Sequence, residues 1–218
     1  MQLDIFSDPI CPWCFIGKRR MEAAFAARPD VKADIQWRAF QLNPDMPLQG
    51  MDRQTYLTTK FGGVDQAKQV YDNIKAVGAS VGLDFKFENI THTPSTMSAH
   101  RLIKYTQRVD PNAADTLLEQ LFTSYFLQGK NIGDIDVLLD IAEKAGLDKK
   151  STRDYLQTME DFEEVQAEDL QARRLGIGGV PCFIIDGQYA LSGAQEPEAF
   201  YPIFDLSMQA KTAESSTA

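Results

Sequence analysis

The chain has 218 residues, of which 44% are hydrophobic and 24% charged, a composition typical of a globular protein with a substantial core. Its 31 acidic side chains outnumber 22 basic ones, and the net charge of −9 argues against nucleic acid as a partner, because phosphate binding needs clustered positive charge. No apolar run approaches the roughly 20 residues that cross a bilayer, and residues 1–6 lack a basic segment followed by an apolar stretch, so we expect a cytoplasmic protein without a membrane partner.

The start of the chain predicts a β-α-β unit. Residues 2–6 alternate polar and apolar side chains and then meet a Ser-Asp-Pro turn signal, as in a short strand. Residues 14–28 are rich in helix formers. Residues 31–42 alternate again, as expected for a half-buried strand.

A block of helices is predicted after residue 50, because the period of the apolar side chains changes from two to about 3.6. Asp134 is the expected N-cap of one of these helices, and Gly146 the expected residue after its end. Residues 154–169 contain seven acidic side chains and no Lys or Arg, which we interpret as a solvated helix face. The helical stretches are expected at 64–81, 94–108, 117–125, 135–145 and 152–175.

The C-terminal part of the chain is predicted to form a β-β-α unit. A glycine-rich segment at 176–179 precedes a compact apolar run at 180–185, which is typical of a strand. Asp186-Gly187 is a hairpin turn signal, and Tyr189-Ala190-Leu191 is the expected returning strand. A final helix is expected at 196–209, followed by a polar tail at 211–218 that we expect to be disordered.

The most informative motif is Cys11-Pro12-Trp13-Cys14, at the predicted start of the first helix. Two cysteines with this spacing can close a small disulfide ring with little backbone movement. The unpaired N–H groups and the positive end of the helix dipole favour an anion at Cys11, so its thiolate should be stabilised. Pro12 has no backbone N–H, which costs little here because N–H groups in the first turn of a helix have no partner within the helix. The Trp13 ring is expected to be exposed beside accessible sulfurs.

A metal site is the competing interpretation, since a C-x₂-C pair supplies half of many zinc sites. The other half is hard to find, because Cys182 stands alone and the two histidines, His92 and His100, lie eight residues apart. We therefore expect no metal. We interpret Cys182 as a strand thiol that points into the core, with a third redox partner or metal ligand as the alternative.

Together these motifs identify a resemblance. The Cys-Pro-Trp-Cys motif after Ser-Asp-Pro-Ile, the helical block, Gly-Val-Pro before the third strand and Ser-Gly-Ala-Gln after the hairpin are similar to the DsbA-like thioredoxin superfamily, and most closely to its cytosolic FrnE-like branch. The resemblance runs from residue 3 to about 209 and implies an α/β fold, a thioredoxin domain with a large all-helical insertion between its second and third strands. The expected division is a thioredoxin-like domain at 1–48 and 176–210, with the insertion at 49–175.

The resemblance also implies roles for individual residues. Cys11 matches the attacking thiol, Cys14 the resolving thiol and Pro181 the cis-proline that faces them. The backbone of Val180 would then pair with an extended substrate segment, as an added strand does. His100 matches an Ala-His-Arg-Leu element of the branch and is either a polar residue near the active site or a helix histidine bonded to a backbone carbonyl.

The leading hypothesis is a thiol-disulfide oxidoreductase or isomerase that needs no cofactor beyond its Cys11–Cys14 disulfide. Its expected partners are substrate proteins or small dithiols and disulfides. One alternative is a glutathione-dependent enzyme of the kappa-class transferase and hydroxychromene-carboxylate isomerase type, with glutathione as co-substrate. The other is a redox-sensing or metal-holding protein without turnover. Substrate identity, direction of electron flow, redox partner and oligomeric state do not follow from the sequence.

Overall fold

A computed structural model describes residues 1–216, with side chains other than those of Val64 and residues 211–216. The strands are β1 (Gln2–Ser7), β2 (Asp34–Ala39), β3 (Met51–Asp52), β4 (His92–Thr93), β5 (Cys182–Ile185) and β6 (Tyr189–Ser192). The helices are α1 (Pro12–Ala27), α2 (Arg53–Phe61), α3 (Val64–Ser80), α4 (Met97–Val109), α5 (Ala114–Phe122), α6 (Ile135–Lys144), α7 (Lys149–Leu156), α8 (Phe162–Arg174) and α9 (Tyr201–Ser216). Short 3-10 turns cover Phe87–Asn89, Pro111–Ala113 and Pro197–Phe200, and a π-helical turn covers Thr123–Leu127.

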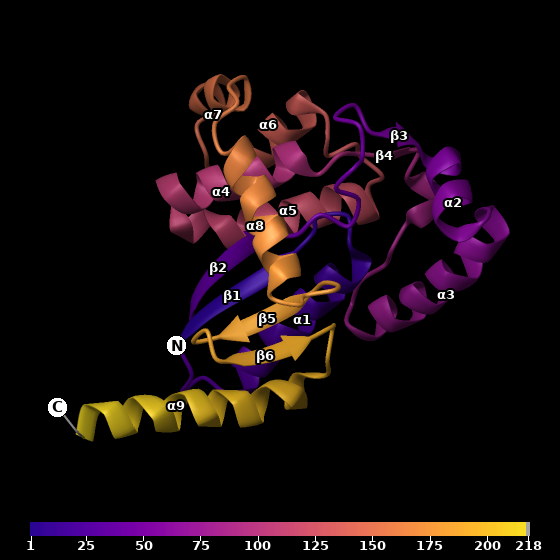
Figure 1. Cartoon of the computed structure of the whole chain (residues 1–218). Coiled ribbons are helices and arrows are strands. Elements are labelled where there is room, and N and C mark those ends of the chain that lie inside the picture. Colours follow the sequence, from indigo (N-terminus) through magenta and orange to yellow (C-terminus); the bar gives the residue numbers. More distant parts are fainter. Residues whose placement is uncertain (217–218) are drawn as a thin grey trace.

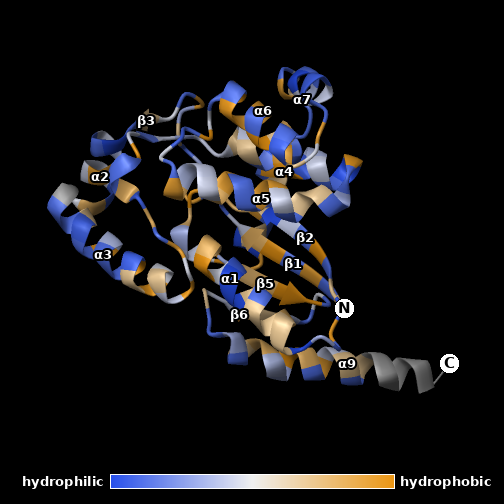
Figure 2. Ribbon diagram, turned by 180° about the vertical axis from the view of Figure 1, so that it is seen from behind, coloured by the Kyte–Doolittle hydropathy of each residue, from blue (hydrophilic) through white to orange (hydrophobic). Residues whose placement is uncertain are grey.

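The central sheet has the strand order β2-β1-β5-β6 (Figure 1). Strand β1 is parallel to β2 and antiparallel to β5, and β5 is antiparallel to β6. Asp186 and Gly187 both have positive φ, 49° and 68°, so the expected hairpin turn is confirmed. Helix α1 covers one face of the sheet and α8 lies on the other, as the two opposite views show (Figures 1 and 2).

Between β2 and β5 the chain forms α2 to α8, together with the two-residue strands β3 and β4. This agrees with the expected thioredoxin fold with a helical insertion between the second and third strands of the sheet. The insertion shares its core with the sheet, because Phe15 on α1 stacks on Phe122 of α5 at 5.0 Å and meets Phe85 edge-on at 6.1 Å. Since one core spans both parts, the domain boundaries proposed from the sequence stay a prediction.

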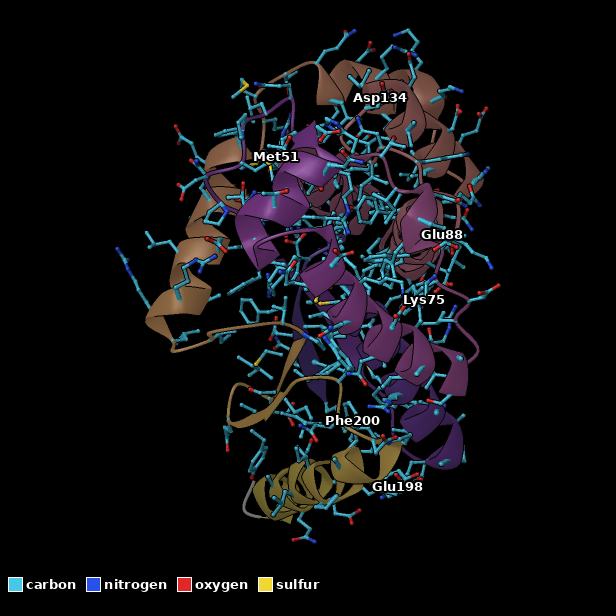
Figure 3. The ribbon with its side chains drawn as sticks, turned by 90° about the vertical axis from the view of Figure 1, so that its right-hand side faces the viewer. Met51, Lys75, Glu88, Asp134, Glu198 and Phe200 are labelled. Carbon is cyan, nitrogen blue, oxygen red and sulfur yellow. The ribbon has the colours of Figure 1, made fainter. Side chains whose placement is uncertain are left out.

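Hydropathy follows this arrangement: the ribbon of β5 is hydrophobic, whereas α2 and α3 alternate along their length (Figure 2). Beyond the core, ion pairs join neighbouring segments. Lys75 on α3 lies 2.6 Å from Glu88 in the following 3-10 turn (Figure 3). The Asp134 side chain accepts from the backbone N–H of Asp136 and Val137, so the predicted N-cap of α6 is confirmed.

The single helix expected at 152–175 was wrong, because the chain breaks into α7 and α8. Arg101 on α4 explains the break. Arg101 is 4% exposed. Its guanidinium donates to four carbonyls at the end of α7 and in the turn that follows it. Those carbonyls belong to Tyr155, Leu156, Thr158 and Glu160, at 2.7–3.4 Å.

The acidic run at 154–169 is also not wholly a solvated face. Glu168 accepts from the backbone N–H of Ala39 at 3.0 Å, and Asp169 accepts from that of Gln41 at 2.8 Å. Ala39 is the last residue of β2 and Gln41 follows it, and β2 is an edge strand of the sheet. The two carboxylates therefore satisfy edge donors and hold α8 on the sheet.

At the C-terminus, helix α9 continues to Ser216, so most of the tail expected to be disordered from Lys211 on is helical. The segment contains Ala, Lys and Glu, which favour helix and whose backbone bonds are made within the helix itself. Thr217 and Ala218 lie outside the described residues. Across residues 1–216, no helix combines the length and the apolar character needed to cross a bilayer.

Candidate active site

The two cysteines lie where β1 passes into α1. Cys11 is the N-cap of α1, with φ −93° and ψ 112°, and its backbone N–H donates to Asp8 O at 2.8 Å. Pro12 begins the helix, as expected for a residue without an N–H, and Cys14 N donates to Cys11 O at 3.0 Å. Both cysteines are free thiols. Cys11 thus occupies the end of the helix where backbone dipoles favour a thiolate.

Neither sulfur-bearing residue is open to solvent: Cys11 is 3% exposed and Cys14 is 2% exposed. The expectation of accessible sulfurs with an exposed Trp13 ring was therefore wrong. Trp13 is half-buried and packs against the main core. Pro12, Trp13 and Val180, which neighbour the cysteines, are half-buried.

Burial has a direct effect on Cys14. Loss of solvation raises the pKa of its thiol well above the ordinary value, and the adjacent Cys11 raises it further. The Ser7 hydroxyl and the Asp8 backbone act in the opposite direction, but burial outweighs them. In the reduced protein Cys14 therefore keeps its proton at neutral pH.

Val180 and Pro181 lie against the cysteine pair. The peptide bond between them is cis, as the resemblance implied, and the Cys11 Sγ lies 3.5 Å from Val180 O. Gly17 on α1 permits this contact. A Cβ at that position would lie 2.8 Å from Pro181 Cγ and 3.4 Å from Phe183 Cζ. Helix α1 and the Val180-Pro181 segment, more than 160 residues apart in sequence, are thus in direct contact.

His100 lies beside Asp8, in the segment between β1 and Cys11, and its role near the active site stays a prediction. It is 4% exposed, and its Nε2 is 3.6 Å from Asp8 Oδ1, longer than a hydrogen bond. Asp8 is completely buried, and its carboxylate accepts from Leu42 N at 2.7 Å and Ile10 N at 3.4 Å. The alternative for His100, a ring bonded to a backbone carbonyl, is not seen for Nε2, which has no hydrogen-bond partner in the described part of the chain.

Comparison with known proteins places this site in a family. Residues 2–203 match the model of the family described as DSBA-like thioredoxin domain. This chain belongs to the DSBA-like thioredoxin domain family. A probable DsbA oxidoreductase from Streptomyces coelicolor is 32% identical, with a TM-score of 0.85, over 96% of this chain and 90% of that one. The uncharacterized protein YwbO of Bacillus subtilis (strain 168) is 29% identical over 204 residues, 92% of this chain and 94% of its own.

More distant structures share the fold of this DsbA-like protein. The cytosolic disulfide reductase DsbM from Pseudomonas aeruginosa is 17% identical, with a TM-score of 0.64 over 100% of both chains. A 2-hydroxychromene-2-carboxylate isomerase is 14% identical, with a TM-score of 0.66 over 100% of this chain and 98% of its own. At these identities only the architecture is common to them, and membership of the FrnE-like branch stays a prediction.

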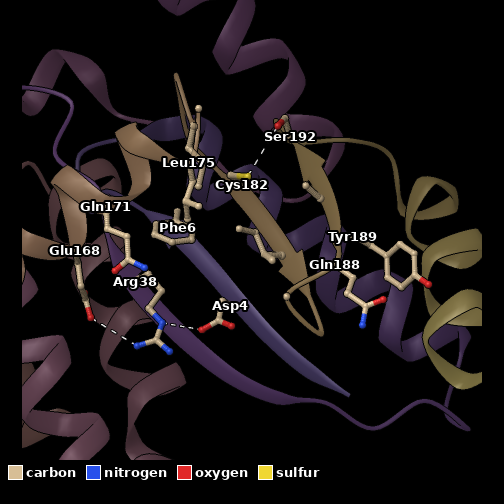
Figure 4. Close-up of a pocket in the computed structure, with 15 residues that line it drawn as sticks. Asp4, Phe6, Arg38, Glu168, Gln171, Leu175, Cys182, Gln188, Tyr189 and Ser192 are labelled. Atoms are coloured by element: carbon tan, nitrogen blue, oxygen red, sulfur yellow. Dashed lines mark hydrogen bonds and ion pairs between the residues drawn. The ribbon is translucent and has the colours of Figure 1, made fainter. Parts of the chain in front are cut away.

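Cys182 belongs to a different environment from the other two cysteines of the DsbA-like chain. It is 2% exposed, its Sγ lies 3.9 Å from Ser192 Oγ, and burial raises its pKa. Its side chain lies at the floor of a cavity of about 550 Å³ between β1, β5, β6 and α8, which neither Cys11 nor Cys14 lines (Figure 4). This agrees with the interpretation of Cys182 as a packed strand thiol. Among the side chains that the structure describes, no three from His, Cys, Asp or Glu are grouped so that they could hold a metal ion.

Sequence analysis missed three residues of this site. Ser7 and Asp8 were treated only as a turn signal, although both are buried beside the cysteines. Tyr56 on α2 is the third: burial raises its pKa, Asn43 and Arg53 act in the opposite direction, and the charges of Asp8 and Cys11 raise it again. Asp8 carried no signal of burial, because it follows the strand and is in phase with Asp4 rather than with the buried Leu3 and Ile5. Tyr56, from the insertion, carried no local signal.

Proposed function

We propose that this DsbA-like protein is a thiol-disulfide oxidoreductase or isomerase that uses Cys11 and Cys14. The observation that carries the proposal is Cys11 at the N-cap of α1, with Cys14 one turn later and Val180 O beside its sulfur. The Cys11 thiolate attacks a substrate disulfide and forms a mixed disulfide. Cys14 then attacks Cys11, which releases the substrate as a thiol and leaves the Cys11–Cys14 disulfide.

Burial of the cysteines adds a requirement to the proposal. A substrate disulfide reaches Cys11 only if the half-buried groups around it, Trp13 and Val180, move aside. Extended substrates can pair with the main chain of Val180, which would make recognition broad in sequence and suits both proteins and small disulfides. In a cytoplasmic setting the pair would be held largely reduced, so reduction or isomerisation is favoured over net oxidation.

The test is the rate at which the purified protein reduces insulin or reactivates a scrambled disulfide substrate with a thiol reductant present. We expect Cys11→Ser to abolish the activity. Cys14→Ser should accumulate a mixed disulfide with substrate, because the attacking thiol remains and the resolving one is lost. Cys182→Ala is the matched control and should keep the activity, since Cys182 lies outside the site. Activity that persists in Cys11→Ser, or that folded Cys182→Ala lacks, contradicts the proposal.

The glutathione-dependent alternative is supported by the fold that this chain shares with 2-hydroxychromene-2-carboxylate isomerase. One structure of DsbM, which also shares the fold, contains GSH. The intact cysteine pair argues against it, because this chemistry would not need both thiols. Glutathione-dependent isomerisation that survives replacement of Cys11 and Cys14 together would favour that alternative.

A further inference from the structure

The cavity of about 550 Å³ beside Cys182 lies on the face of the sheet that is turned away from α1 (Figure 4). Strand side chains form its floor, whereas Phe183, the next residue on β5, points the other way and lies 3.4 Å from the position of a Cβ on Gly17. Cavities of roughly 300–1,000 Å³ are the usual size of small-molecule sites. Since the proposed exchange reaction makes no use of this cavity, it is a candidate for a second, independent binding site.

The strand register gives the floor of the cavity an elongated shape. Phe6 on β1 lies opposite Arg38 on β2 and opposite Cys182 on β5, and Cys182 lies opposite Ser192 on β6. These four side chains form a row that crosses the whole sheet. A second row lies beside it, one pleat along the strands. It consists of Asp4, Ile184 and Ala190.

All seven side chains of the two rows line the cavity, and we call this floor the sheet trough. Neighbouring strands lie about 4.8 Å apart, so the three spacings from β2 to β6 make the trough about 14 Å long. A ligand that fills it is therefore long and narrow.

The two ends of the sheet trough differ in polarity. At the β2 end, Arg38 Nε donates to Asp4 Oδ1 at 2.7 Å, and Arg38 Nη1 lies 3.6 Å from Glu168 Oε1 (Figure 4). Toward β6 the floor is mainly apolar. Leu175, which is 61% exposed, adds an apolar side chain to the rim. An elongated apolar ligand with one polar end matches this distribution.

The hydrogen bonds at the polar end determine which charge a ligand should carry. Asp4 accepts from two side chains, and Glu168 accepts from a backbone N–H and from Lys104 Nζ. The two acids are therefore balanced by Arg38 and Lys104. In the part of the chain that the structure describes, no hydrogen bond or ion pair engages Arg38 Nη2. The unused group at this end is a guanidinium donor, which suits a carboxylate.

We propose that the sheet trough binds a linear monocarboxylate, with its carboxylate on Arg38 and its chain lying across β1 and β5 toward β6. An extended chain of about ten carbons matches the trough length of about 14 Å. The Cys182 thiol forms part of the apolar floor under this chain. Binding is noncovalent and does not involve Cys11 or Cys14, so the inference goes beyond the proposed function and does not rest on it.

Isothermal titration calorimetry of the full chain tests the length of the site. The probes are hexanoate, octanoate, decanoate, dodecanoate and tetradecanoate, each below its micelle-forming concentration. We expect Kd to fall by about fourfold for each added methylene up to decanoate, the ratio that corresponds to about 0.8 kcal/mol per buried CH₂, and then to level off. Absence of decanoate binding would overturn the proposal. So would an affinity that keeps rising through tetradecanoate, because adsorption to an apolar surface has no fixed length.

A comparison of decanoate with 1-decanol tests the charge. We expect wild type to bind 1-decanol about 10-fold more weakly, and Arg38→Gln to weaken decanoate by about 10-fold without changing 1-decanol. Arg38→Lys should restore part of the decanoate affinity. Arg153→Gln is the matched control, since Arg153 on α7 pairs with Asp136 at 3.0 Å and does not line the cavity. Equal affinities of wild type for the two ligands, or equal weakening of both in Arg38→Gln, would contradict a carboxylate site.

Ala190→Trp tests the position of the chain, because the added indole would fill the β6 end of the sheet trough. We expect it to weaken decanoate at least 10-fold while hexanoate, which does not reach β6, is unchanged. Ala190→Ser is the matched control and should bind both acids as wild type does. Insulin reduction should be unchanged in both variants, which also shows that they are folded. Decanoate binding that survives in Ala190→Trp would place the ligand elsewhere and overturn the proposal. Failure of the proposed function would leave all these affinities as expected.

Discussion

The hydroxyl group of Tyr125 is buried without a partner among the described residues. Tyr125 is 1% exposed, and burial raises the pKa of its phenol. Since a buried unpaired hydroxyl destabilises the folded state, we expect Tyr125→Phe to raise the free energy of unfolding by about 1 kcal/mol at pH 7. Urea unfolding of the reduced protein measures the change.

The same variant should also alter the pH dependence. Tyr125 and Cys14 both have raised pKa values in the folded state, so the fold favours their protonated forms. Their contribution is fully present below the unfolded pKa values, about 8.5 for a thiol and 10 for a phenol, and is lost as pH rises beyond them. Tyr125→Phe should lose less stability than wild type above about pH 10. Tyr189→Phe, at a half-buried position, is the control. An equal alkaline loss in Tyr125→Phe would contradict the expectation.

Helix α1 is held between two other parts of the molecule. Lys18, whose side chain is 1% exposed, lies 3.1 Å from Asp115 and 3.3 Å from Glu119 on the α5 side. On the other side Gly17 lies against Pro181. The helical insertion and the Val180-Pro181 segment therefore both fix the position of the redox helix, although each is distant from it in sequence.

Gly17→Ala tests the second of these contacts. The added methyl group would lie 2.8 Å from Pro181 Cγ, a ring atom that cannot swing away, so α1 and the Pro181 segment must separate. We expect a loss of about 1–3 kcal/mol in stability and slower disulfide exchange, because Cys11 and Val180 move apart. Gly178→Ala is the matched control, since no atom lies within 4 Å of its added Cβ. Wild-type stability and exchange in Gly17→Ala would show that this contact adjusts freely.

The whole molecule carries a net charge of −9. A field of one sign raises the encounter rate with ligands of opposite charge, and salt screens it as the Debye length falls from about 30 Å at 0.01 M to 8 Å at 0.15 M. We expect a disulfide peptide flanked by lysines to react faster than its glutamate-flanked counterpart at low salt, with the difference shrinking as salt is added. An uncharged disulfide, whose rate should not vary with salt, is the control. Equal rates for the two peptides at low salt would mean that the net charge does not steer substrates.

Local patterns predicted the parts of the fold that depend on neighbouring residues. Alternation located β1 and β2, and a compact apolar run located β5. Asp186-Gly187 located the hairpin turn and with it the returning strand β6, and the 3.6 period located α3, α4 and α6. They failed where a distant residue intervenes. Arg101 ends α7 from another helix, and Glu168 and Asp169 turn from expected surface acids into partners of β2. These bonds join residues more than 50 positions apart, so no window of sequence contains both partners.

By itself, the sequence determined the chemistry that this protein can carry: two thiols with a C-x₂-C spacing at a helix start, because that spacing and that dipole are local properties. Only the tertiary structure decided how buried those thiols are, since packing of the insertion over α1 leaves Cys11 and Cys14 nearly closed to solvent. It also decided which polar groups reach them. Val180 O lies beside Cys11, and His100 lies beside Asp8 just before the cysteines, because distant segments of the chain converge there. Such convergence follows from the summed packing of the chain rather than from any single segment.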